Sequence, residues 1–78
     1  MSINDRIKRV LSEILTIPET DISEDFSQNH ASQWSSLAHL TVVLALEEEF
    51  QVRFTDAETL GMTSFRQIQS TLAGKGIQ

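Results

Sequence analysis

Residues 34–50 read WSSLAHLTVVLALEEEF, in which a tryptophan and two serines precede an apolar segment that ends in three glutamates and a phenylalanine. Ser35 is well placed to cap a helix, because its hydroxyl can accept a hydrogen bond from an N–H group of the first turn. We therefore predict a helix over residues 36–50. With about 100° of rotation per residue, one side of this helix carries Val42, Val43, Leu46 and Phe50.

A second side of the same helix carries Leu37, Thr41, Leu44 and Glu48, at i, i+4, i+7 and i+11. A helix that is apolar over most of its circumference is normally buried, but a small domain cannot bury both sides. We predict that the first side faces the core, and that Leu37 and Leu44 are exposed for a partner.

The 78 residues form one domain, 1–78, and contain no cysteine that could form a disulfide. A hydrophobic core must hold such a short chain without disulfides, which favours closely packed helices. The first helix is predicted from residue 3 to residue 15 or 16, because Pro18 pushes Ile17 out of helical geometry. Its apolar residues have helical spacing, and they are Ile3, Ile7, Val10, Leu11 and Ile14.

Residues 16–34 form a long polar connection, which we expect Ile17, Ile22 and Phe26 to fix to the core. After the second helix, Val52 and Phe54 point inward, and a short helix begins near Asp56 and ends at Gly61. Thr63 and Ser64 then cap a last helix, followed by a frayed tail with two glycines. The inward face of this helix carries Phe65, Ile68 and Leu72. The fold class is therefore all-α.

The net charge of −5 argues against nucleic acid and anionic membranes as partners and favours basic protein surfaces. No apolar run approaches the roughly 20 residues of a membrane span. We expect a cytoplasmic protein. We also expect a monomer, because the exposed apolar stripe is short.

No residue pattern in the chain predicts catalysis or metal binding. His30 and His39 lack a third ligand at metal spacing, and no base or Ser/His/Asp triad can be assigned around Ser36. We expect His39 to be a hydrogen-bonded packing residue and Trp34 to anchor the loop on the helices. The chain is therefore predicted not to be an enzyme.

The order of these features resembles the acyl carrier proteins and, more loosely, the peptidyl carrier proteins. The resemblance covers nearly the whole chain. The residues that carry it are the 21–25 loop (DISED), Trp34 before Ser35-Ser36-Leu37, and the 44–50 end (LALEEEF). It implies a four-helix bundle of the acyl-carrier type, with a long loop between the first two helices and a short third helix.

The resemblance further implies that Ser36 receives a 4'-phosphopantetheine arm from coenzyme A through a separate phosphopantetheinyl transferase. The thiol of the arm would carry acyl intermediates as thioesters to enzymes of fatty-acid, polyketide or related biosynthesis. These acyl-activating or acyl-transferring partners would have basic docking surfaces. The expected docking stripe consists of Leu37, Thr41, Leu44, Glu47 and Glu48.

Two departures from the family pattern leave alternatives open. The family's aspartate before the modified serine is Ser35 here, and Ala38, His39 and Thr41 occupy positions that are often acidic. The second departure favours a specialised carrier over the housekeeping one. The first departure leaves open a carrier-like interaction module that is never modified. An aminoacyl or peptidyl carrier is a further alternative, and a small hydrolase that uses Ser36 is a remote one.

Overall fold

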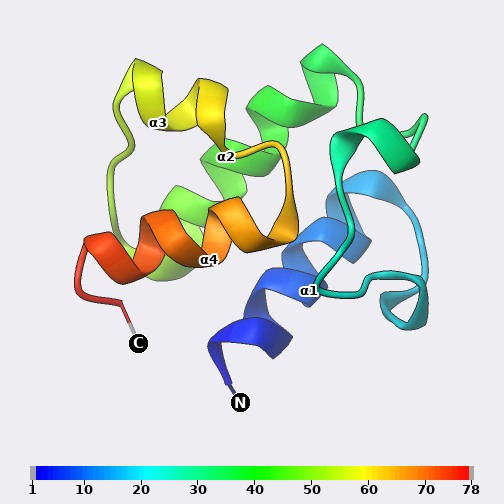
Figure 1. Ribbon diagram of the computed structural model, residues 1–78, viewed down its shortest axis with the longest axis horizontal. Helices are drawn as coiled ribbons and strands as arrows, with labels where there is room; N and C mark the ends of the chain where they lie inside the picture. The colour runs from blue at the N-terminus through cyan, green and yellow to red at the C-terminus, as the bar shows by residue number, and fades with distance from the viewer. Residues whose placement is uncertain (1, 78) are drawn as a thin grey trace.

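The computed structural model describes residues 2–77, and these residues are all-helical apart from turns and one isolated antiparallel bridge. The four α-helices surround one core (Figure 1). Their bounds are α1 Ile3–Leu15, α2 Ser36–Phe50, α3 Asp56–Gly61 and α4 Phe65–Gly74. Two short 3₁₀ turns, η1 Glu19–Asp21 and η2 Gln28–His30, lie in the loop between α1 and α2. The predicted all-α class and helix ranges are confirmed.

Helix α1 starts at the Ser2 cap, whose side chain accepts a hydrogen bond from the Asp5 N–H. It buries its apolar face, as the spacing predicts, whereas Arg6 and Arg9 of its polar face pair with Glu49 of α2. The buried residues are Ile7, Val10, Leu11 and Leu15. The helix ends at Thr16, which adopts the left-handed conformation with φ 57° and ψ 49°. The helix therefore ends through a backbone turn at Thr16, two residues before Pro18. In this turn the Ile17 N–H donates to the Ser12 carbonyl.

Replacing Thr16 by glycine is expected to stabilise the protein. A left-handed conformation costs a β-branched residue about 1–2 kcal/mol, whereas glycine adopts it freely and loses about 0.5–1 kcal/mol in chain entropy. Thr16 is exposed, so no packing is lost. We expect Thr16→Gly to raise the free energy of unfolding by about 0.5–1 kcal/mol in urea titrations. An equal gain in Thr16→Ala, which retains a Cβ, would contradict this account.

The long loop is fixed to the body at several points, as predicted. Ile22 and Phe26 are buried, and Ile17 packs against the core. Backbone hydrogen bonds join the loop to the start of α4, from the Phe65 N–H to the Phe26 carbonyl and from the Gln28 N–H to the Thr63 carbonyl, at 2.9 and 2.8 Å. The loop that leads to α2 is therefore part of the folded body.

Helix α2 presents the predicted inward side to the core. Its buried residues are His39, Val42, Val43, Leu46 and Phe50. Helix α4 buries the predicted Phe65, Ile68 and Leu72. Trp34, just before α2, is only 1% exposed and stacks on Phe26 with ring centroids 5.7 Å apart, which confirms its anchoring role.

Two details at the C-terminal ends of α3 and α4 differ from expectation. Gly61 is the last residue of α3 but has no left-handed conformation, since the cap that follows is Met62 with φ −88°. The tail after α4 is not frayed through residue 77. Gly76 takes the left-handed conformation at φ 84°, the Ile77 N–H donates to the Leu72 carbonyl, and Ile77 packs against the core. A glycine cap that returns the chain to the core explains the difference.

Candidate functional site

The two serines at the start of α2 have separate structural positions. Ser35 is the N-cap, with extended backbone, and its Oγ accepts a hydrogen bond from the Ala38 N–H at 3.2 Å. Ser36 is the first helical residue and is exposed. Within residues 2–77 the Ser36 hydroxyl has no hydrogen-bond partner, so it is open to a reagent from solvent.

The first turn of α2 also leaves backbone donors available near Ser36. The Ser35 side chain uses the Ala38 N–H, and the Ser35 carbonyl accepts from the His39 N–H at 2.8 Å. The N–H groups of Ser36 and Leu37 come before the first intrahelical bond and point out of the helix end. Such donors, together with the helix dipole, favour a phosphate group at this position.

A partly buried chain of hydrogen bonds lies beneath this turn. The Trp34 indole Nε1–H donates to His39 Nδ1 at 3.0 Å, and His39 Nε2 is 2.6 Å from the Thr59 carbonyl oxygen of α3. Indole can only donate and a carbonyl can only accept, so the partners assign His39 the tautomer with hydrogen on Nε2. Both ring nitrogens are occupied, which confirms the prediction of a hydrogen-bonded packing residue. It also leaves His39 without a free nitrogen to act as a base for Ser36.

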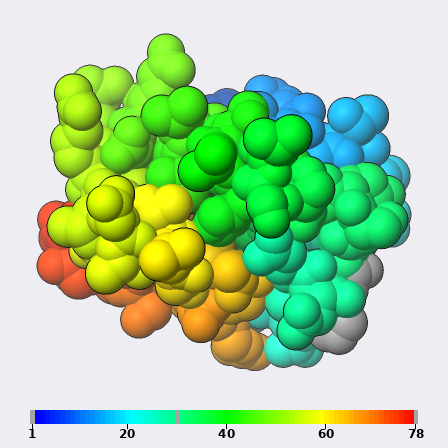
Figure 2. Space-filling model, turned by 90° about the horizontal axis from the view of Figure 1, so that it is seen from above, coloured from blue at the N-terminus to red at the C-terminus, as the bar shows by residue number. Residues whose placement is uncertain are grey.

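An apolar pocket of about 300 Å³ lies beside Ser36, between α2 and α3. Figure 2 shows the two helices next to each other on one face, α2 in green and α3 in yellow. The lining residues from α2 are Ser36, His39 and Leu40, and those from α3 are Thr59 and Leu60. Gln28 and Thr63 complete the wall.

The predicted exposure of Leu37 and Leu44 is confirmed, at 80% and 64%. Thr41 between them is also exposed. Leu40 and Leu60 are 55% and 78% exposed and were not predicted to be surface residues. Leu40 lies about 60° around the helix from Leu37 at 100° per residue, so helical geometry alone could have found it. Helix α3 is too short to reveal a periodic exposed face, and Leu60 could not have been found in that way.

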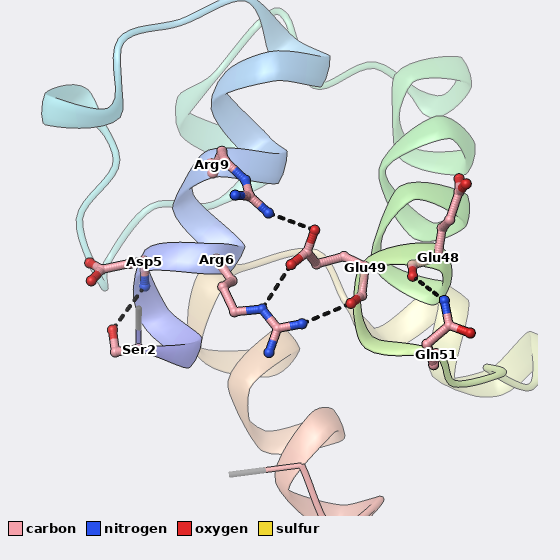
Figure 3. A network of polar contacts seen from close by, with 7 residues as sticks. All are labelled: Ser2, Asp5, Arg6, Arg9, Glu48, Glu49 and Gln51. Carbon is pink, nitrogen blue, oxygen red and sulfur yellow. Dashed lines mark hydrogen bonds and ion pairs between the residues drawn. The ribbon is translucent and has the colours of Figure 1, made fainter.

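The three glutamates at the end of α2 have different surroundings. The Glu47 carboxylate accepts a hydrogen bond from the Phe54 N–H at 2.8 Å. Glu49 bridges Arg6 and Arg9 of α1 at 2.8 and 2.7 Å, and the Arg6 guanidinium also donates to the Glu49 carbonyl. Figure 3 shows the Glu48 carboxylate pointing away from both arginines. Glu47 and Glu49 therefore serve the fold, and the Glu48 carboxylate is open to a partner.

The hydrogen bond from Arg6 is the main reason that the pKa of Glu49 lies below its ordinary value. Burial acts in the opposite direction as the second-largest effect, and Arg9 lowers the pKa further. A carboxyl whose pKa is lowered by folding stabilises the protein above its unfolded value, near 4.5, and loses that contribution as the pH falls through the folded value. The Arg6 guanidinium also lies over the Phe50 ring, 4.4 Å from its centroid. The bridge thus fastens the end of α2 to α1.

Glu49→Gln is expected to lower the free energy of unfolding at neutral pH by a few tenths to about 1 kcal/mol, the range for solvent-screened ion pairs. The deficit relative to the wild type should shrink as the pH falls below the ordinary value of 4.5 and through the lower pKa of the folded state, because protonation removes the same charge from the wild type. Urea titrations over this pH range measure the deficit. The matched control is Glu48→Gln, which removes an adjacent charge without breaking the bridge. An equal deficit in both variants would contradict the assignment.

No model of a known protein family matches this chain. Within the described part of the chain, no three His, Cys, Asp or Glu side chains are placed to hold a metal ion. The side chain of His30 lies outside that part. None of the described helices is long and apolar enough to cross a membrane.

Proposed function

We propose that this chain is a carrier protein of the acyl-carrier type, with Ser36 as the attachment point for a 4'-phosphopantetheine arm. The observation that carries the proposal is that the two serines have different structural roles. Ser35 caps the helix through its side chain, whereas the Ser36 hydroxyl is exposed and unpaired within residues 2–77. A helix stabilised by one serine can therefore have the other modified without losing its cap.

The environment of Ser36 supports attachment by a separate enzyme over catalysis by the chain itself. A serine hydroxyl is a weak nucleophile without a base, and both nitrogens of His39 are hydrogen-bonded elsewhere. The outward N–H groups of the first turn favour the phosphodiester that attachment would create. The thiol at the end of the arm would carry an acyl group as a thioester, in fatty-acid, polyketide or related biosynthesis. We expect no hydrolysis of activated esters.

Partner enzymes would dock on an exposed stripe of α2, which we extend to α3. Leu40 and Leu60 widen the predicted stripe toward α3. The predicted stripe consists of Leu37, Thr41, Leu44, Glu47 and Glu48. Since Glu47 and Glu49 accept internal hydrogen bonds, Glu48 is the acid of this group best placed to meet a basic partner. The surface area of four exposed leucines is far smaller than the roughly 1,200 Å² that a stable interface buries. The contacts with partner enzymes are therefore transient.

The test is the intact mass of the protein after incubation with coenzyme A and a broad-specificity phosphopantetheinyl transferase. We expect the addition of one phosphopantetheine. Ser35→Asp, which restores the acid of the family pattern, serves as the matched variant and should be modified at least as fast. If neither protein gains mass while both remain folded, the carrier proposal fails and an unmodified interaction module is favoured.

A further inference from the structure

Helix α3 packs less deeply than the other α-helices, although Met62 at its end is fully buried. None of its residues is buried, so it lacks the apolar face that fastens the other α-helices. Within residues 2–77, two polar contacts join it to other helices or their caps. They are the hydrogen bond from His39 to the Thr59 carbonyl at 2.6 Å, and the ion pair between Lys75 Nζ and Glu58 Oε1 at 2.9 Å.

The two contacts differ in their environment. The His39 bond is partly buried, and His39 as a residue is only 7% exposed. The Lys75–Glu58 pair is more open, with side chains 22% and 32% exposed. Glu58 has further partners within α3, because its carboxylate also accepts from the Thr55 N–H in a capping box. Salt screens the charges of the Lys75–Glu58 pair more than it weakens the partly buried hydrogen bond of His39, so the His39 bond is the contact that persists in salt.

We propose that His39 is a positioning residue that latches α3 to α2 and thereby sets the width of the apolar pocket beside Ser36. The chain of hydrogen bonds fixes the direction of the bond. Trp34 Nε1–H occupies Nδ1, so the hydrogen on Nε2 points at α3. Thr59, which receives this hydrogen bond, and its neighbour Leu60 both line the pocket, and His39 and Ser36 line it from α2.

The consequence for function rests on the proposed carrier role. An arm attached to Ser36 would start at the edge of this pocket, since Ser36 is one of its lining residues. When the His39 hydrogen bond to α3 is formed, the pocket keeps its present width. When this bond is broken, α3 can move and the space next to the arm changes. His39 would thus determine whether an attached group meets a formed or an open pocket.

The experiment compares His39→Gln with His39→Asn in the unmodified protein, at about 1 M salt to screen the Lys75 pair. The two side chains share one amide group, but the glutamine NH₂ reaches the position of Nε2 and the asparagine amide reaches only that of Nδ1. Hydrogen exchange is measured at the Thr59 and Met62 amides, which are bonded within α3 and its end. Long-range ¹⁵N NMR of the wild type reports the His39 tautomer.

We expect hydrogen on Nε2, near-wild-type protection of α3 in His39→Gln, and a roughly tenfold loss of protection in His39→Asn. Amides of α1 should change less than those of α3 in His39→Asn, because a local release does not unfold the body. Hydrogen on Nδ1 would overturn the proposal. Equal loss in both variants, or an equal change in α1 and α3, would also overturn it. Ser36 plays no part in these measurements, so failure here is distinct from failure of the carrier proposal.

Discussion

Trp34→Ala is expected to lower the free energy of unfolding by about 3–5 kcal/mol, the usual cost of removing a large buried aromatic side chain. Trp34 is 1% exposed, so nearly its whole volume would become a cavity or force the loop to collapse. The stacking on Phe26 would be lost, and His39 Nδ1 would lose its donor while still buried. Because small domains have only about 5–15 kcal/mol of stability, this variant should be close to unfolding at room temperature.

Urea unfolding followed by circular dichroism measures this effect, since the variant lacks the chain's single tryptophan as a fluorophore. Trp34→Phe is the matched control. It retains an aromatic ring for Phe26 but cannot donate to His39, and should lose about 1–3 kcal/mol. A loss below about 1 kcal/mol in Trp34→Ala would contradict the anchoring role.

The second large effect is that alanine variants of the two serines should differ in opposite ways in modification and in stability. Ser36→Ala is expected to abolish phosphopantetheine addition completely, because the acceptor oxygen is gone, and to change stability by no more than about 0.5 kcal/mol. Ser35→Ala is expected to retain the addition but to lose about 1 kcal/mol of stability, because the α2 cap is removed. Intact mass and urea titration on the same preparations measure both effects.

Loss of modification in Ser35→Ala alone would contradict the assignment and move the attachment point by one residue. A large loss of stability in Ser36→Ala would contradict the finding that its hydroxyl serves no structural role. Because each serine is tested for both modification and stability, the two results distinguish a wrong attachment point from a wrong structural role of Ser36.

The helices of this chain could be predicted from local patterns. Ser35 and Ser64 cap α2 and α4 as expected, and the apolar spacing of α1 gave its buried face. The exposure of Leu37 and Leu44 followed from the size of the domain, since a chain of this length cannot bury every side of α2. The caps and the buried face of α1 depend on residues within a few turns of one another, and the exposure of Leu37 and Leu44 depends on the length of the chain.

The features that could not be predicted depend on residues far apart in the sequence. Glu49 pairs with Arg6 and Arg9 of α1, and no local pattern indicates that one of three adjacent glutamates is used in this way. The second partner of His39 is a backbone carbonyl of α3, which has no side-chain signature in the sequence. The left-handed cap at Thr16 was missed because a β-branched residue rarely adopts this conformation.

The most direct test of the carrier proposal is tandem mass spectrometry of the fragment containing residues 34–41 after transfer from coenzyme A. We predict that phosphopantetheine is present on fragment ions that include Ser36 and absent from ions that end at Ser35. Phosphopantetheine on Ser35, or an unmodified fragment from folded protein, would contradict the account of Ser36 as the attachment point.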